Sequence, residues 1–358
     1  MSLTREQLQQ KIHNGEIVER QALGPLALEQ CDLSGAIFEN VSFTGTRLGQ
    51  ARLSECVFNE CMFTDVDLVG ADLSKSTFLK SELLHTSFHE SLLDDCRLLE
   101  TRAHGTRFSS IRATRLAFLK SDLRECRFDA AHIEFGVFDE TPLPGTDFST
   151  AVIHKSLFYR LDLRDVCLAR TQFDSVVFTE SNLAGQVLRG QTLHRCQFID
   201  TDLRHVDFTS ASLPHCNFQG ALLEGAVLDD VDAPFANFFG ANVSGAQCRG
   251  GRFPNSIWVD ALARKTDFTG ANLSGAVFQR ADACQSRFVR AHLEDADLSS
   301  TELSEADFHE ASFERTRVCH NHANGGAGDP DWQGRAGVIG DDAALHAAQS
   351  WSAKRDAR

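Results

Sequence analysis

The chain has 358 residues and a formal net charge of −15, so its surface is expected to repel nucleic acid and anionic lipid. No run of 18 apolar residues is present, so we expect no membrane-spanning segment. The eleven cysteines include no C-x-x-C pair, which removes the common zinc and thioredoxin signatures.

The first predicted element is a short helix near the N-terminus. Thr4 and Gln7 have the spacing of a capping box, in which each residue satisfies the backbone of the other. Leu8 and Ile12 then form an apolar stripe on one side of the helix. We therefore predict a helix at about 4–14 that covers the exposed end of the structure that follows.

The second element is an uninterrupted array of five-residue repeats from 26 to 320. From Cys31 the blocks read CDLSG AIFEN VSFTG TRLGQ ARLSE, and 58 consecutive blocks follow without a slip to His320. The central residue is Leu in 23 blocks and Phe in 24, and the residue two positions earlier is Ala, Cys, Ser, Thr, Val or Gly in 53. A period of five matches neither an α-helix nor an ordinary strand.

One large and one small inward residue in every five indicate a chain that turns a corner every five residues. Four corners close a square coil of 20 residues, with Leu or Phe in its middle. The small residue lets successive coils stack at strand-like spacing. Each coil then buries its apolar side chains only against its neighbours, which is typical of a solenoid.

The repeat resembles that of the pentapeptide-repeat family, whose motif is A(D/N)LxX. The blocks ADLSK at Ala71, ANLSG at Ala271 and ADLSS at Ala296 follow this motif closely. The resemblance covers about four-fifths of the chain and implies an all-β fold, a right-handed quadrilateral β-helix. Such a fold does not by itself specify a function.

The last element is a tail outside the repeats. Residues 321–341 are rich in glycine and predict a flexible linker. In 342–353, Leu345, Ala348 and Trp351 have helical spacing. Such a helix would cap the last coil, dimerise or dock on a partner, and a disordered tail is the equal alternative. The predicted organisation is a cap at 1–25, a β-helix at 26–320, a linker at 321–341 and a helix or tail at 342–358.

The four faces of the predicted coil differ in composition. One face, centred on the column from Phe38 through Phe178 and on to Trp258 and Phe278, carries apolar residues on both sides of the centre. Contiguous apolar surface usually marks an interface, whereas β-propensity alone is the structural alternative. The candidate interface residues are Ala117, Leu119, Val137, Leu157, Tyr159, Val177 and Ile199.

A second candidate feature is a cluster of acids near the end of the array, without Lys or Arg among them. A solvated end that resists edge-to-edge stacking is an equal alternative to a binding patch. The acidic end patch consists of Glu294, Asp295, Asp297, Glu302, Glu305, Asp307, Glu310 and Glu314.

Motifs that carry chemistry are missing from the sequence. It has no Gly-Lys pair of a Walker A loop, no G-x-S-x-G and no H-E-x-x-H. We therefore predict no enzyme activity, no catalytic residue, no cofactor and no metal. We also expect no signal peptide, because charges occupy the start of the chain, and a reduced, cytoplasmic setting, because the cysteine number is odd.

Two functions follow as hypotheses. The first is a non-catalytic scaffold or adaptor that binds another protein, with a homodimer as one arrangement. Its lead-in LQQKIHNGE at Leu8–Glu16 resembles pentapeptide proteins associated with bacterial type VI secretion effector loading. The second is a DNA-mimicking protein that binds gyrase, similar to quinolone-resistance pentapeptide proteins. The acidic charge favours it, whereas the alternating signs of the column from Glu60 to Arg160 argue against it.

Overall fold

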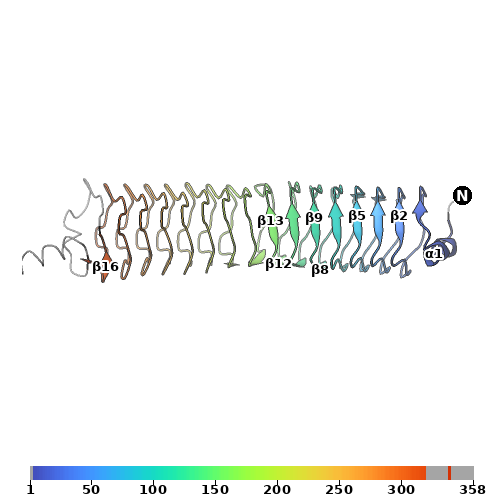
Figure 1. Ribbon diagram of the computed structural model, residues 1–358, viewed down its shortest axis with the longest axis horizontal. Coiled ribbons are helices and arrows are strands. Elements are labelled where there is room, and N and C mark those ends of the chain that lie inside the picture. The colour runs from blue at the N-terminus through green and yellow to red at the C-terminus, as the bar shows by residue number, and fades with distance from the viewer. Residues whose placement is uncertain (1–2, 320–337, 340–358) are drawn as a thin grey trace, which may run out of the picture. The chain divides into compact units, whose positions relative to one another are not determined.

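The computed structural model describes residues 3–319 and 338–339. The chain divides into two compact units, unit 1 from Met1 to Asn182 and unit 2 from Leu183 to Arg358. In each unit the backbone winds into stacked coils, which Figure 1 shows as successive turns of the ribbon. Early rungs of four parallel columns pair Ala22 with Ser42, Ala27 with Arg47, Asp32 with Arg52, and Ile37 with Val57. This confirms the predicted all-β fold of quadrilateral coils with 20 residues each.

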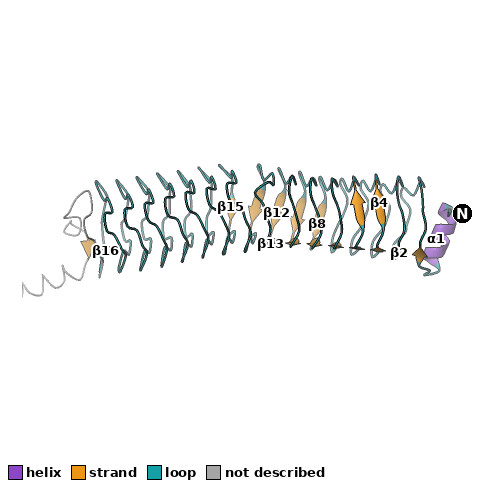
Figure 2. Ribbon diagram, turned by 90° about the horizontal axis from the view of Figure 1, so that it is seen from above, coloured by secondary structure: helices purple, strands orange, loops and turns teal. Residues whose placement is uncertain are grey.

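The predicted N-terminal helix is present as α1 (Arg5–His13), drawn in purple in Figure 2. The hydroxyl of Thr4 accepts the N–H of Gln7 at 3.3 Å, and the side-chain oxygen of Gln7 accepts the N–H of Thr4 at 3.0 Å. Leu8 is fully buried, and Asn14 is the C-cap. The capping box and the buried stripe residue are therefore confirmed.

Replacing Thr4 by alanine is expected to destabilise α1 by about 1 kcal/mol, because the backbone N–H of Gln7 loses its side-chain acceptor. Amide hydrogen exchange of residues 5–13 should become faster by a factor of about 5, while exchange in the coils of unit 1 is unchanged. Thr4→Ser is the matched control, since serine keeps the hydroxyl. Equal exchange in both variants would contradict the role of the cap.

Unit 1 contains three groups of parallel strands. Eight strands form one sheet, in the order β1-β2-β3-β5-β7-β9-β11-β13. They are β1 (Val18–Glu19), β2 (Ile37–Glu39), β3 (Val57–Asn59), β5 (Thr77–Leu79), β7 (Arg97–Leu99), β9 (Ala117–Leu119), β11 (Val137–Asp139) and β13 (Leu157–Tyr159). A second sheet holds β8 (Arg112–Thr114), β10 (His132–Glu134), β12 (Val152–His154) and β14 (Gln172–Asp174), and a third pairs β4 (Met62–Thr64) with β6 (Glu82–Leu84).

Unit 2 is held together mostly by single parallel bridges rather than by longer strands. Its described strands are β15 (Leu193–His194), β16 (Thr316–Arg317) and β17 (Val338–Ile339). β17 pairs with β16 and lies within the predicted linker at 321–341. The remaining residues of that linker and the predicted helix or tail at 342–358 lie outside the described residues.

The core of both units consists of the central Leu and Phe residues. Within unit 1, Phe118 stacks on Phe138 of the next coil with ring centroids 5.2 Å apart, and meets Phe128 edge-on at 5.7 Å. All three side chains are fully buried. Offset stacks and edge contacts are the arrangements that aromatic rings prefer. The predicted inward position of the central residue is therefore confirmed.

Buried hydroxyl groups connect coils where a corner lacks its own turn hydrogen bond. In unit 2, every block from Thr201 to Ala311 begins with an N–H that bonds the preceding central carbonyl. In the eight-stranded sheet, by contrast, the N–H of Thr101 bonds the hydroxyl of Ser121 at 3.1 Å. That hydroxyl donates to the carbonyl of Leu98 at 3.0 Å. Ser and Thr at the small position thus satisfy buried backbone groups that Ala would leave unpaired.

The regular five-residue register conceals one backbone irregularity in unit 1. From Gly35 to Arg315, every described corner residue except Asp165 has a positive φ. Pro142 has no N–H, and the column that links Arg102 with Asp122 resumes only at Asp162 with Asn182. A pocket of about 350 Å³ lies at this interruption, lined by Thr141, Pro142, Leu143, Pro144, Arg160, Asp162 and Asp165.

Candidate binding face

The candidate interface lies on the outer side of the eight-stranded sheet of unit 1. We call this surface the eight-strand face. Its outward side chains flank each central residue, because successive residues of a strand point to opposite sides. They are Ile37, Glu39, Val57, Asn59, Thr77, Leu79, Arg97, Leu99, Ala117, Leu119, Val137, Asp139, Leu157 and Tyr159.

The structure brings six of the seven predicted interface residues together. Ala117, Val137 and Leu157 occupy neighbouring rungs of one column, and Val177 bridges Leu157 in the same column. Leu119 and Tyr159 lie in the parallel column on the other side of the centre, with Asp139 between them. All six are half-buried. Ile199 is also half-buried but belongs to unit 2.

Tyr159 is held in a fixed orientation by charged neighbours. The guanidinium of Arg160 lies over its ring, 4.6 Å from the centroid. The phenol Oη is 3.3 Å from Glu180 Oε1, and Arg160 Nε donates to the other oxygen of Glu180 at 2.9 Å. A fixed aromatic ring with a polar tip is suited to an interface because little entropy is lost on binding.

Charged corner residues border the eight-strand face on both sides. The first rim column precedes the strands and contains Glu55, Lys75, Asp95, Arg115, Phe135 and Lys155. Lys75 Nζ lies 2.9 Å from Glu55, and Arg115 contacts both oxygens of Asp95 at 2.5 and 2.6 Å. The hydrogen bonds from Arg115 lower the pKa of the Asp95 carboxyl. Lys155 lies over the ring of Phe135 at 5.1 Å.

The second rim column follows the strands and alternates in sign, as the sequence predicts. It contains Glu60, Lys80, Glu100, Lys120, Glu140 and Arg160. Glu140 lies between Lys120 at 3.9 Å and Arg160 at 3.8 Å. The exposed side chains of Glu60, Lys80 and Glu100 form no hydrogen bond or ion pair with any described residue. The first half of this column therefore has charges that are free to meet a partner.

Several large apolar side chains other than the seven candidate residues are more exposed than those residues. In unit 2, Phe235 is 54% exposed, and Phe239 and Ile257 are each 40% exposed. The ring of His215 stacks on Phe235 with centroids 5.1 Å apart. The placement of Phe at an exposed corner, where the repeat has no requirement for an apolar residue, is the sequence signal that would have found Phe235.

The acidic end patch is partly neutralised by a base that follows it in the sequence. Arg315 contacts both oxygens of Asp295 at 2.6 and 2.7 Å, and its hydrogen bonds lower the pKa of that carboxyl. Glu294 accepts from the hydroxyls of Ser312 at 2.6 Å and Ser274 at 3.2 Å. The spacing of 20 residues between Asp295 and Arg315 would have predicted this pair.

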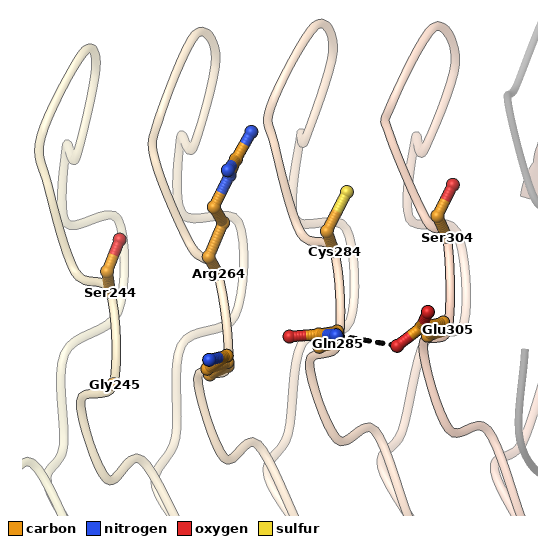
Figure 3. A pocket seen from close by; sticks show the side chains of 8 residues that line it. Ser244, Gly245, Arg264, Cys284, Gln285, Ser304 and Glu305 are labelled. Carbon is orange, nitrogen blue, oxygen red and sulfur yellow. Dashed lines mark hydrogen bonds between the residues drawn. The ribbon is translucent and has the colours of Figure 1, made fainter.

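Open pockets lie in both units. One in unit 2 has a volume of about 590 Å³ and is lined by Ser244, Gly245, Arg264, Lys265, Cys284, Gln285, Ser304 and Glu305 (Figure 3). Arg264 already pairs with Asp282 at 2.6 Å, and Gln285 donates to Glu305 at 2.6 Å. Among residues 3–319, no group of three or more His, Cys, Asp and Glu side chains is arranged to hold a metal ion.

Seven cysteines occupy the small inward position, as hydrophobic residues do. All seven are buried and free: Cys31, Cys56, Cys61, Cys96, Cys126, Cys196 and Cys216. Burial raises the pKa of Cys56 to about 12 and that of Cys61 to about 11. A thiol with so high a pKa stays protonated at neutral pH and is a poor nucleophile.

Two family models match the repeats of the chain. The model described as "Pentapeptide repeat region" matches residues 31–108. The model described as "Pentapeptide repeats (8 copies)" matches 171–209, 207–245, 244–280 and 276–315. No curated protein sequence matches the chain. In the described part of the chain, no helix is long and apolar enough to cross a membrane.

Several solved structures match the chain at low sequence identity. HetL, a pentapeptide repeat protein involved in heterocyst differentiation regulation in the cyanobacterium Nostoc, is 18% identical over 88% of this chain and 96% of its own, with a TM-score of 0.18. Full-length QnrB1, a plasmid-mediated fluoroquinolone resistance protein, is 18% identical over 67% and 98%, with a TM-score of 0.20. A thylakoid lumen protein of Arabidopsis thaliana is 25% identical over 35% and 66%, with a TM-score of 0.14. These values support no inference about function.

Proposed function

Because this chain belongs to the pentapeptide-repeat family, we propose that it is a non-catalytic scaffold that binds another protein through its eight-strand face. The composition of this face carries the proposal. A central strip of half-buried apolar residues, with Leu119 and Leu157 among them, lies between two columns of charged corners. A central apolar region with a polar rim is the usual anatomy of a protein interface.

The test replaces two residues of the central strip by glutamate. Leu119→Glu together with Leu157→Glu places two charges where a partner would exclude water, so association should weaken by a factor of about 100 or more. The measurement is co-purification of bound proteins followed by titration of the recovered partner. The thermal unfolding curve reports whether the coils remain intact.

Matched controls place the same charge on other faces of unit 1. Met62 and Leu92 are 45% and 37% exposed and lie outside the eight-stranded sheet. Met62→Glu and Leu92→Glu should leave association unchanged. If these controls weaken association as much as the double variant, the eight-strand face is not the binding surface.

The finer proposal is a role in bacterial type VI secretion effector loading. The lead-in Leu8–Glu16 supports it. Within this segment, Lys11 pairs with Glu16 at 2.8 Å and Leu8 is buried, so these residues also stabilise the cap. Binding of a purified effector that is lost on deletion of α1, while the coils stay folded, is the expected result. A cytoplasmic setting is part of this proposal, and the free cysteines are compatible with it.

The alternative is a DNA-mimicking protein that binds gyrase, and the net charge of −15 is the observation that favours it. The rim columns alternate in sign, whereas the phosphates of DNA are uniformly negative. A gyrase supercoiling assay separates the two functions. Inhibition or protection of gyrase by the purified protein at micromolar concentration would favour the alternative, and no effect is expected from a scaffold.

A further inference from the structure

In five of six successive coils, the two rim columns of the eight-strand face carry the same sign. Each coil places one residue of the first rim column and one of the second on opposite borders of the face. The successive pairs are Glu55 and Glu60, Lys75 and Lys80, Asp95 and Glu100, Arg115 and Lys120, Phe135 and Glu140, and Lys155 and Arg160. The face is therefore crossed by bands of charge that alternate from coil to coil.

Ion pairs within one copy account for the alternation along a column but not for the bands. Pairs such as Lys75 with Glu55 require only that neighbours in one column differ in sign. They set no relation between the two columns, which lie on opposite borders. In addition, Glu60, Lys80 and Glu100 alternate in sign yet form no ion pair with one another or with other described residues. A partner that contacts both rim columns at once would account for the matching signs across the face and for the unpaired charges of the second column.

The middle of the face combines a row of leucines with the charged side chains of Arg97 and Asp139. Leu79, Leu99 and Leu119 follow one another in a single column, paired rung by rung through β5, β7 and β9. Asn59 and Asp139 lie at the two ends of this leucine row. The six charge bands are centred between β7 and β9, where Leu99 and Leu119 are neighbours.

We propose that the partner of the eight-strand face is a second copy of this chain, packed antiparallel about a two-fold axis between β7 and β9. This inference rests on the proposed use of that face for binding. The axis is perpendicular to the direction in which the coils of unit 1 stack, so it exchanges β7 with β9, β5 with β11 and β3 with β13. Each rim column then faces the same column of the other copy.

This register places opposite charges against each other along both borders. In the second rim column Glu100 faces Lys120, Lys80 faces Glu140, and Glu60 faces Arg160 of the other copy. In the first rim column Asp95 faces Arg115, Glu55 faces Lys155, and Lys75 faces Phe135, whose ring already accepts a cation from Lys155. Leu99 meets Leu119 across the axis. An axis through a coil, or a parallel pair in register, would instead oppose like charges.

The size of the contact predicts a reversible dimer. Six coils at about 4.8 Å and a face five residues wide give a planar footprint of about 29 by 16 Å per copy. That area is at the low end of specific interfaces, so a dissociation constant of about 1–100 µM is expected. The charged borders also predict weaker association at high salt.

The experiment measures the mass of the full chain by sedimentation and uses two complementary charge reversals. Variant one is Glu60→Lys with Glu100→Lys, and variant two is Lys120→Glu with Arg160→Glu. Each alone opposes like charges at four contacts, so its dissociation constant should rise by about 100-fold or more. In a 1:1 mixture all four contacts have opposite signs again. We expect a heterodimer whose dissociation constant lies within about 5-fold of the unaltered protein.

Failure of the mixture to associate, when both variants show the circular dichroism of folded coils, overturns the proposal, as does an unaltered protein that stays monomeric at about 1 mM. If variant two fails to fold because five successive acids from Glu100 to Glu180 would repel one another in one column, a smaller pair replaces it. Glu100→Lys in one chain is then mixed with Lys120→Glu in another, and the same recovery is expected.

A different result would contradict the proposed function, so the two proposals can be told apart. If the protein is monomeric but loses a different bound partner on Leu119→Glu and Leu157→Glu, the eight-strand face is a binding surface. The proposal of a second copy as its partner is then overturned.

Discussion

Replacing Trp258 by alanine is expected to lower the free energy of unfolding of unit 2 by about 3–5 kcal/mol. Trp258 is fully buried and stacks between Phe238 and Phe278, with ring centroids 4.0 and 5.4 Å away. Phe253 and Phe268 meet it edge-on at 5.5 and 5.4 Å. Alanine would remove all four ring contacts and leave a cavity that the stacked coils cannot close, because each coil is held by bridges on four sides.

The loss should extend beyond the altered coil. Coils of a solenoid contact only their neighbours, so a defect at one position lowers the cooperativity between the segments on either side. Chemical denaturation followed by circular dichroism gives the free energy, and amide hydrogen exchange locates the coils that open first.

Trp258→Phe is the matched control for the cavity. Phenylalanine is the residue at this position of the preceding and following coils, so the ring stack should persist. The variant loses the hydrogen bond from the indole nitrogen to Ser256 Oγ, which is 2.7 Å long, but Ser256 keeps its bond to the carbonyl of Phe253. A cost below about 1.5 kcal/mol is expected. If this variant is as unstable as Trp258→Ala, the stack is not the cause.

The second large effect is expected at a buried hydroxyl of the eight-stranded sheet. Ser121→Ala should destabilise unit 1 by about 1–3 kcal/mol, because it leaves buried backbone groups without partners. The N–H of Thr101 loses its acceptor at 3.1 Å, and the carbonyl of Leu98 loses its donor at 3.0 Å. The measurement is the midpoint of urea denaturation together with hydrogen exchange at the amide of Thr101.

Ser91→Ala is the matched control within unit 1. Ser91 is as buried as Ser121, and its hydroxyl donates to the carbonyl of Leu68 at 2.7 Å. That carbonyl also accepts the N–H of Ala71 at 3.0 Å, so it keeps a partner when the hydroxyl is removed. The cost at Ser91 should stay below about 1 kcal/mol. Equal costs at the two positions would contradict the relay.

The contrast between Ser121 and Ser91 concerns the small inward position of the repeat, where the family motif has alanine. The motif begins with alanine, and at a corner closed by its own turn hydrogen bond alanine leaves nothing unpaired. At the open corner of Thr101, the hydroxyl of Ser121 in the next coil takes the place of the turn hydrogen bond. Serine also follows a closed corner, as Ser91 does 20 residues after Ala71.

The candidate face was predicted only in part from the sequence. The column through Ala117, Val137 and Leu157 could be assigned because residues 20 apart share a face, and the alternation from Glu60 to Arg160 follows from the same rule. The exposure of each side chain could not be assigned, because it depends on the rotamers of its neighbours. The predicted residues proved half-buried, whereas Phe235 and Phe239 in unit 2 are more exposed.

The sequence by itself determined what lies inside each coil. A large residue in every five has only one place that removes it from water, so the position of Phe118 or Trp258 follows from the period alone. The capping box at Thr4 is equally local, since its two hydrogen bonds join residues three apart.

Only the tertiary structure decided which corners are open, which charges are paired and where the register is disturbed. Pro142 has no N–H for its column, and Asp165 in the next coil lacks the positive φ of the other corner residues. Arg315 neutralises Asp295 from one coil away, while Lys80 forms no ion pair with a described residue. These outcomes depend on contacts between coils, whose energies are small and compete with water. The repeat period sets which residues are neighbours, and the packing of those neighbours sets which of them interact.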